Sequence, residues 1–274
     1  MAIEGMQRIA NEEGDFVGDP IDSQAELFRL QLITREFPPA GAHIAMAGRA
    51  SNGAHYFCKN DTTGIPARMR EALYSKFITH LGIPTPEFAA VEDEGTGETY
   101  FGSKRHQSTA DDIERKRFLR TERRDEFNCH LPFPKKMLSQ LYAVDLFIGN
   151  VDRSASNIIL HREGLHSRRL CPIDFTLAKL GETPAEIFPV ESTETVQVGR
   201  LLRKVHGFCD VSALEMVDHI SVIPPEVFMG FFRDIPQDWI DVREREALNE
   251  LWYGQGRHDR LQRLRVGLKD GRLL

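Results

Sequence analysis

Long apolar runs are missing from this sequence of 274 residues. No stretch approaches the roughly 18–20 apolar residues that a helix needs to cross a bilayer. The first segment, MAIEGMQRIANEEGDF, also lacks the basic start and apolar stretch of a secretory signal. We therefore expect a cytoplasmic protein that does not insert into a membrane.

Cysteine is scarce as well. The four cysteines, Cys58, Cys129, Cys171 and Cys209, are far apart in the sequence and form no C-x-x-C pair. This spacing excludes a cysteine-based metal site and offers no disulfide framework, so we expect reduced thiols. Internal repeats and low-complexity tracts are also absent.

An excess of basic charge is absent too, because the formal net charge is −6. General nucleic-acid binders carry a basic surface, so we do not expect direct nucleic-acid binding. Basic residues do gather between residues 257 and 272, but Leu261, Leu264 and Leu268 recur there at helical spacing. This pattern favours a packed last helix whose basic residues form a solvated face.

What is present is an ordinary globular composition, with 41% hydrophobic and 28% charged residues. Residues 1–23 are acidic, contain two glycines and a proline, and predict a loose N-terminal arm. Residues 24–105 carry β-like patterns with one helix, and residues 106–274 are mainly helical. We therefore predict an α+β fold of two lobes, with a small β-rich N-lobe, a larger helical C-lobe and a cleft between them.

The N-lobe pattern predicts strands over residues 26–37, around residues 42–47 and over residues 55–59, separated by turns. We expect a small antiparallel sheet with Lys59 at the end of its third strand. A helix over ARMREALYSKFITHLG follows and turns Glu71 away from its main apolar stripe. The segments PEFAAVED and ETYFGSKRH predict two more strands joined by a turn.

The stretch IGNVDRSASNIIL, residues 148–160, places a polar octet between two apolar segments. A second acid, Asp174, ends the next apolar segment, and a hairpin between Asn157 and Asp174 would bring both side chains to one point. Asn and Asp oxygens are ligands that Mg²⁺ accepts beside phosphates. Asp152 would then be free to orient a hydroxyl and accept its proton during attack on phosphorus.

Lys59 and Glu71 supply the remaining parts of a phosphoryl-transfer site. A lysine at a strand end neutralises phosphate oxygens, and a glutamate on the following helix keeps it extended. Taken singly, each of these residues is more typical of a turn, a helix cap or a solvated surface. The ordered set of Lys, Glu, Asp-x4-Asn and Asp-Phe on strand, helix, loop and strand end is what favours the site.

In the same order, the segments YFCKN, REALYSKFITHLGIPTPE, YFGSKRH, LFIGNVDRSASNIIL and PIDFTLA resemble those of the bacterial HipA-like kinases. The resemblance extends from about Leu27 to Leu264 and implies a protein-kinase-like fold that uses ATP and Mg²⁺. It implies the following roles: Asp152 as catalytic base, Asn157 and Asp174 as metal ligands, Lys59 with Glu71 on the ATP phosphates, and the backbone of Gly102, Ser103 and Lys104 as the hinge at the adenine.

The sequence departs from the kinase pattern at three places. Thr176 follows Asp174-Phe175 where a typical kinase has Gly, and Ser154 stands where related sequences often carry His. No G-x-G-x-x-G covers the phosphates, so PPAGA must serve as the phosphate loop, with Gly41 giving the close backbone approach. Asp145, inside an apolar helix, is interpreted as a buried acid bonded to the catalytic loop.

The phosphoryl acceptor stays open. A Ser/Thr protein acceptor follows from the resemblance, whereas a small-molecule phosphotransferase of the aminoglycoside or choline kinase type uses the same Asp-x4-Asn and Asp arrangement. A nucleotide-binding pseudokinase is a third interpretation, because Thr176 and the phosphate loop with its single Gly41 depart from the pattern of active kinases. Autophosphorylation is a further hypothesis, because Thr176, Ser192, Thr193 and Thr195 lie where an activation segment would be.

Overall fold

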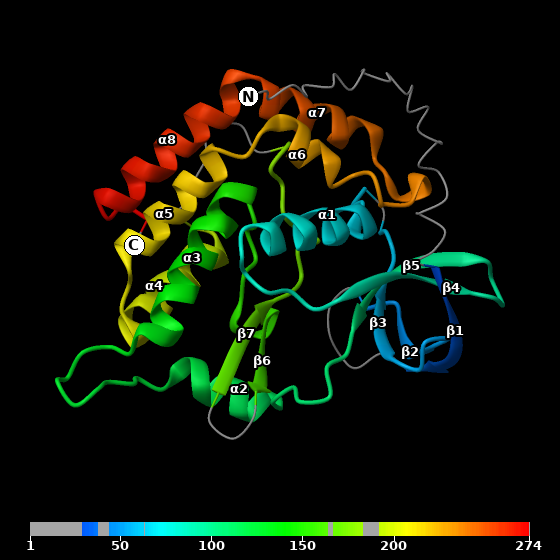
Figure 1. The fold of residues 1–274 in the computed structure, drawn as a ribbon, viewed down its shortest axis with the longest axis horizontal. Helices are drawn as coiled ribbons and strands as arrows, with labels where there is room; N and C mark the ends of the chain where they lie inside the picture. Colours follow the sequence, from blue (N-terminus) through cyan, green and yellow to red (C-terminus); the bar gives the residue numbers. More distant parts are fainter. Residues whose placement is uncertain (1–28, 38–43, 63, 164–166, 183–191, 274) are drawn as a thin grey trace, which may run out of the picture.

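The computed structural model describes residues 29–37, 44–62, 64–163, 167–182 and 192–273. Strands β1 to β5 gather on one side of the molecule and most helices on the other, with helix α1 between them (Figure 1). The protein is therefore α+β, with a β-rich N-terminal region and a helical C-terminal part, as the sequence predicts. The expected arm over residues 1–23 lies outside the described residues, and the lobe boundary between residues 105 and 106 stays a prediction.

The N-terminal strands close into a barrel in the order β1-β2-β3-β5-β4. Their bounds are Arg29–Glu36, Met46–Ala50, His55–Lys59, Phe88–Asp93 and Glu98–Lys104 for β1 to β5. Strands β1, β2 and β3 pair antiparallel, as the sequence predicts. In addition, β1 and β4 pair in parallel through Arg29↔Ala90 to Gln31↔Glu92. Parallel pairing needs a long crossover, here the chain that includes α1, and a local hydrophobic pattern does not reveal it.

The barrel interior is filled by the buried side chains of Leu32, Ala50, Tyr56, Cys58, Val91 and Tyr100. Gly102 faces this interior, where a Cβ would lie 2.5 Å from Val91 Cγ2. A larger residue at this position would therefore push the strands apart. The second strand starts at Met46 rather than near Ala42, and residues 38–43 lie outside the described residues.

Helix α1, Ala67–His80, packs in the same core as the C-terminal helices rather than only against the barrel. The ring of Phe77 contacts four aromatic rings from distant parts of the chain: Phe147, Phe228, Phe231 and Trp252. The helix ends as expected before Gly82, whose φ of 82° favours glycine. The helix that carries Glu71 is thus held by the helical part of the protein.

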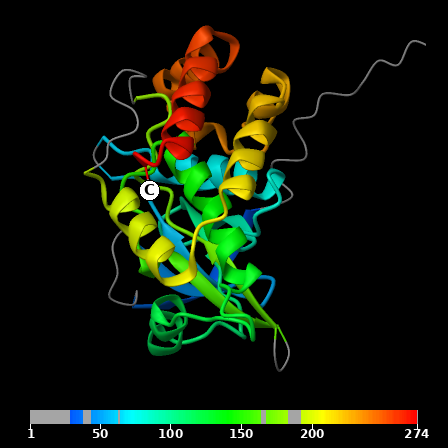
Figure 2. The same ribbon diagram turned by 90° about the vertical axis from the view of Figure 1, so that its left-hand side faces the viewer.

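The C-terminal part is built around α3, Pro132–Ile148, which packs against α4, α5 and α8 (Figure 2). The other helices are α2 Asp112–Arg120, α4 Glu194–His206, α5 Asp210–Ser221, α6 Pro225–Gly230, α7 Val242–Tyr253 and α8 Gln255–Lys269. Two 3-10 turns, η3 Ala155–Asn157 and η4 Gln237–Trp239, complete it. Among the described helices, none has the length and apolar character to span a membrane.

The last helix packs as the leucine spacing predicts, with Leu261, Leu264 and Leu268 buried. The prediction of a wholly solvated basic face was wrong at Arg260, which is fully buried and donates from Nε to Phe147 O at 2.6 Å. In the interior, a main-chain carbonyl can accept the hydrogen bond that an exposed guanidinium would donate to water. All four cysteines are free thiols, in agreement with their spacing.

Strands β6, Ile158–Glu163, and β7, Ser167–Pro172, form the expected antiparallel hairpin. Ile158 pairs with Pro172, and Ile173 N donates to Asn157 O at 3.0 Å. Because β6 follows the polar octet and β7 precedes Asp174, the hairpin brings the two polar segments side by side. This arrangement positions the candidate site.

Candidate functional site

Lys59, Glu71 and Asp174 meet at one point between the barrel and the helical part. Lys59 Nζ lies 2.7 Å from Glu71 Oε1 and 2.7 Å from Asp174 Oδ1. The three residues come from the end of β3, from α1 and from the end of the β6–β7 hairpin. Burial lowers the pKa of a lysine, but the two carboxylates raise the pKa of Lys59 above its usual value and keep it charged.

Glu71 Oε1 accepts two further hydrogen bonds, from Phe175 N and from Thr176 Oγ1, both at 2.8 Å. Glu71 is 2% exposed and Thr176 is 0% exposed. Thr176 and the backbone of Phe175 therefore tie the segment after Asp174 to the helix that carries Glu71. This contact makes the segment stiffer, where a glycine would leave it free to turn.

Replacing Thr176 by Val should measure this tie, because Val keeps the shape and removes the hydroxyl. Hydrogen bonds to charged groups contribute about 1.5–3 kcal/mol, so we expect the free energy of unfolding to fall by about that amount. Urea unfolding followed by circular dichroism measures it. Thr176→Ser, which keeps the hydroxyl, is the control and should lose less; equal losses for the two variants would contradict the role of the hydroxyl.

Asp174 adopts a left-handed backbone conformation with φ 65°. Among residues other than glycine this conformation is uncommon, although Asp and Asn tolerate it better than most. The ion pair with Lys59 and the bond from Phe175 N to Glu71 hold the segment on both sides. The carboxylate is thereby directed into the site by a backbone that its neighbours fix.

The polar loop of residues 150–157 is held by hydrogen bonds to Asp145, which is fully buried in α3. Asp145 Oδ2 accepts from Arg153 Nε at 2.8 Å, and its Oδ1 accepts from Arg153 Nη2 and Asn150 Nδ2, both at 2.9 Å. Arg153 Nη1 also donates to the carbonyls of Asn157 and Ile173. Asp145 is thus the buried acid bonded to the loop that the sequence led us to expect.

Thr195 of α4 holds the same loop from another side. Its Oγ1 donates to Asn150 O at 2.6 Å and accepts from Arg153 N at 2.9 Å. Thr195 and Thr176 are buried, and Thr193 caps α4, so these three residues have structural roles. Ser192 is the exposed member of the four residues considered for autophosphorylation.

Asp152 lies in the same loop and is half-buried. Its Oδ1 is buried and has no hydrogen-bond partner among the described residues. Burial, and secondly the neighbouring charge of Asp174, raise the pKa of Asp152 to about 6. Asn157 Nδ2 donates to the main-chain oxygen of Asp152 at 3.3 Å, which keeps the two side chains on the same loop close together.

Lys59, Glu71, Ser103, Lys104 and Asp174 line one cleft of about 800 Å³, which we call the Lys59 cleft. Asp152 and Asn157 lie beside it, next to Asp174. Gly102 faces the barrel interior instead, and Gly41 lies outside the described residues. Its volume lies within the range of small-molecule binding sites.

The predicted hinge at Gly102–Lys104 lies within β5, which pairs with β3 and β4. Lys104 N donates to Glu87 O at 2.8 Å, and Arg105 N donates to His55 O at 2.7 Å. These two amides are therefore already used in this structure. A contact between this backbone and an adenine stays a prediction.

Sequence reasoning missed Arg70, which precedes Glu71 and is 1% exposed. Its Nε lies 2.9 Å from both carboxylate oxygens of Glu244 in α7, and its Nη1 donates to Thr176 O at 3.2 Å. One signal could have found it, because Arg70 shares a helical face with Leu73, Tyr74 and Phe77. A charged residue on an apolar face needs a buried partner.

Comparisons with solved structures find chains of similar fold. No family model matches the chain, and no curated protein matches it in sequence. Among solved structures, the chain is similar to the Helicobacter pylori proinflammatory kinase CtkA, with a TM-score of 0.55 and 10% sequence identity. The similarity covers 86% of this chain and 96% of that one. At this identity the likeness concerns the fold alone: over most of its length, the chain has a fold similar to that of a bacterial kinase.

Proposed function

We propose that this protein is an ATP- and Mg²⁺-dependent phosphotransferase with a two-lobed protein-kinase-like fold, of the HipA-like kinase type, that phosphorylates a Ser or Thr hydroxyl of a protein. The observation that carries the proposal is the meeting of Lys59, Glu71 and Asp174 in one cleft beside Asp152. Residues separated by more than a hundred positions converge there on a kinase-like fold. A chance set of surface residues does not explain a buried convergence of this kind.

In this proposal Lys59 holds the phosphates of ATP, and Glu71 keeps the lysine extended. Glu71 is suited to that task because three donors fix its Oε1: Lys59 Nζ, Phe175 N and Thr176 Oγ1. Asp174, which pairs with Lys59 here, shares the lysine with the incoming phosphates. The hinge at Gly102–Lys104 and the phosphate loop at Gly41 belong to the same proposal.

Asn157 and Asp174 would hold the Mg²⁺. Their amide and carboxylate oxygens suit this hard cation, and the hairpin places their backbones next to each other. Within the described part of the chain, no three His, Cys, Asp or Glu residues gather as a metal site. The metal would therefore depend on phosphate oxygens for further ligands, and it would neutralise charge on the phosphates.

Asp152 orients the acceptor hydroxyl and accepts its proton. Its Oδ1 makes no hydrogen bond to a described residue, and its raised pKa of about 6 makes it a stronger base than an ordinary aspartate. Arg153 does not take part in proton transfer, because its guanidinium is bound to Asp145 and two carbonyls. It positions the loop.

The test is incubation of the purified protein with γ-labelled ATP and Mg²⁺, beside an Asp174→Ala variant. We expect label on the wild-type protein or on an added protein acceptor, and a loss of about 10²-fold or more in the variant, the scale of one transition-state-stabilising group. Protein-bound label and released phosphate are both measured.

Other outcomes distinguish the remaining functions. Mg²⁺-dependent ATP binding without label on any protein, together with transfer to an aminoglycoside or choline, would favour a small-molecule phosphotransferase. Binding without any transfer would favour a pseudokinase. An absence of ATP binding would overturn the proposal as a whole.

A further inference from the structure

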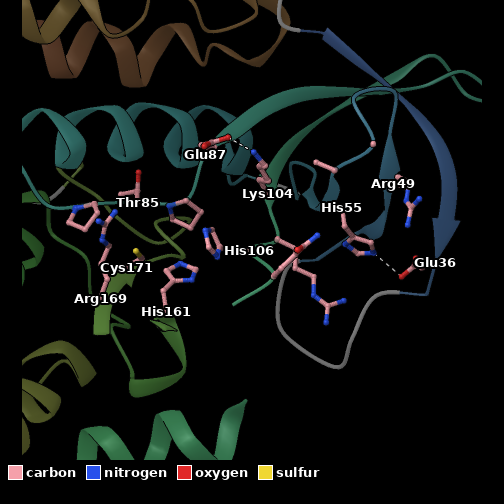
Figure 3. Close-up of a pocket in the computed structure, with 16 residues that line it drawn as sticks. Glu36, Arg49, His55, Thr85, Glu87, Lys104, His106, His161, Arg169 and Cys171 are labelled. Carbon is pink, nitrogen blue, oxygen red and sulfur yellow. Dashed lines mark hydrogen bonds and ion pairs between the residues drawn. The ribbon is translucent and has the colours of Figure 1, made fainter. Parts of the chain in front are cut away.

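A second pocket, of about 830 Å³, adjoins the Lys59 cleft beyond the end of β5 (Figure 3). We call it the His106 pocket. Its charged and titratable lining comes from the barrel, from the end of β5 and from the β6–β7 hairpin, and comprises Glu36, Arg49, His55, Glu87, Lys104, Arg105, His106, His161 and Arg169. It shares Glu36, His55, Pro86, Lys104, Arg105 and His106 with the Lys59 cleft.

The His106 pocket is cationic although the chain as a whole carries a net charge of −6. Both of its carboxylates are already paired, Glu87 with Lys104 at 2.5 Å and Glu36 with His55 at 2.8 Å. The guanidinium groups of Arg49 and Arg105 make no hydrogen bond or ion pair with any described residue. Positive charge therefore remains uncompensated in a concave site, where the field that it creates is concentrated.

Two histidine rings form the centre of the pocket. The ring centroids of His106 and His161 lie 4.5 Å apart, and Figure 3 shows both rings near Arg169. His106 Nδ1 is hydrogen-bonded to Ser108 Oγ at 2.8 Å, and Nε2 of the same ring has no partner among the described residues. Imidazole nitrogens and guanidinium forks are donors that match the oxygens of phosphate groups.

The lining disfavours other kinds of ligand. Phe, Tyr and Trp are absent from it, so only imidazole rings and guanidinium groups could stack on a nucleic-acid base. The described residues of the pocket include no cluster suited to a metal ion. None of Lys59, Glu71, Asp152, Asn157 and Asp174 lines it, so the pocket is separate from the reacting groups proposed above.

We propose that the His106 pocket binds a small polyanion that carries phosphate groups. Arg49 of the barrel and Arg169 of the hairpin both line the pocket, so a ligand there lies between the two sides of the molecule, next to the Lys59 cleft. The spread of cations around the pocket requires more than one anionic group, and the volume admits a molecule of the size of a nucleotide. The evidence for this site comes from the lining of the pocket and does not depend on the proposed phosphotransferase activity.

Calorimetric titration with inorganic tripolyphosphate, at fixed ionic strength, tests the site. Arg49→Glu and Arg169→Glu should each weaken binding by about tenfold or more, because each loses a charge-assisted contact and gains a repulsive charge. Both side chains are exposed, so the fold should persist. The milder Arg49→Gln and Arg169→Gln, checked by thermal unfolding, should show weaker losses of the same kind. Arg243→Glu, on the exposed face of α7, is the matched control and should bind within about twofold of the wild type.

Tripolyphosphate can also enter the Lys59 cleft, so Lys59→Met is titrated in parallel. The proposal expects this variant to retain a binding event that Arg49→Glu and Arg169→Glu weaken. Loss of all binding in Lys59→Met with no effect of the two arginine variants would place the anion in the Lys59 cleft and overturn the proposal. Equal weakening by Arg243→Glu, binding of citrate as tight as that of tripolyphosphate, or no binding by the wild type would overturn it as well.

Discussion

Replacing Asp152 by Asn is expected to slow phosphoryl transfer by about 10²- to 10⁴-fold, the usual contribution of a general base. Asn has nearly the same shape and still accepts a hydrogen bond, but it cannot take the proton of the acceptor hydroxyl. Because Asp152 does not line the Lys59 cleft, binding of Mg²⁺–ATP should change little. Single-turnover rates with labelled ATP, beside ATP binding measured by calorimetry, separate the two effects.

The same variant is expected to be more stable than the wild type. Burial and Asp174 raise the pKa of Asp152 to about 6, so the ionised carboxylate is unfavourable in the folded protein. A raised pKa means that the folded state binds this proton more tightly, so stability is lost as the pH rises from about 4 to about 6. The stability advantage of Asp152→Asn should therefore grow across this window and stay constant above it.

Glu94→Gln is the control, because it removes one exposed negative charge from the turn between β4 and β5. It should leave both the rate and the pH dependence of stability close to those of the wild type. An Asp152→Asn protein with an unchanged rate would show that Asp152 is a loop residue. An unchanged stability profile would show instead that the carboxylate is solvated in the folded protein.

Much of the site follows from local patterns in the sequence. A strand that ends in Lys59, a helix that carries Glu71 and a polar loop followed by a hairpin are each short-range features. The pairing of Ile158 with Pro172 follows from two apolar segments joined by a polar turn, and it suffices to bring Asn157 near Asp174. The order of these elements along the chain was therefore enough to predict that Lys59, Glu71 and Asp174 meet.

Other features depend on contacts between distant elements, and a single sequence does not show them. Closure of the barrel requires β1 to pair with β4 across the chain that includes α1. The packing of Phe77 among Phe228, Phe231 and Trp252 depends on how the last helices fold back. The spacing of basic residues in the last helix also does not show that Arg260 is buried. Its guanidinium donates to the carbonyl of Phe147, which lies in a distant helix.

Arg70 and Glu244 are the clearest case of such a distant contact, 174 positions apart. Arg70 Nε and Nη2 lie 2.8–2.9 Å from the carboxylate of Glu244, and Arg70 also contacts Glu182 and Thr176 O. Burial raises the pKa of Glu244, so its carboxylate depends on Arg70 to remain charged. The pair fastens α1, with Glu71 as the next residue, to α7.

Breaking this pair from one side is expected to cost about 3–5 kcal/mol of unfolding free energy, because the remaining charge stays buried without its partner. Arg70→Met and Glu244→Gln should both show the loss in urea unfolding. Lys76→Met is the matched control on the same helix, since its partner Asp234 is exposed and such a pair contributes about 0–1 kcal/mol.

The double variant Arg70→Met/Glu244→Met removes both charges together, and it should be more stable than either single variant. Recovery of stability would show that the cost comes from the unpaired charge, while a smaller recovery of ATP turnover would show that the pair also positions Glu71. If the losses of the two single variants simply add in the double variant, the two side chains do not act as a pair. In that case Phe77 and its aromatic neighbours would be what holds α1 against the helical part.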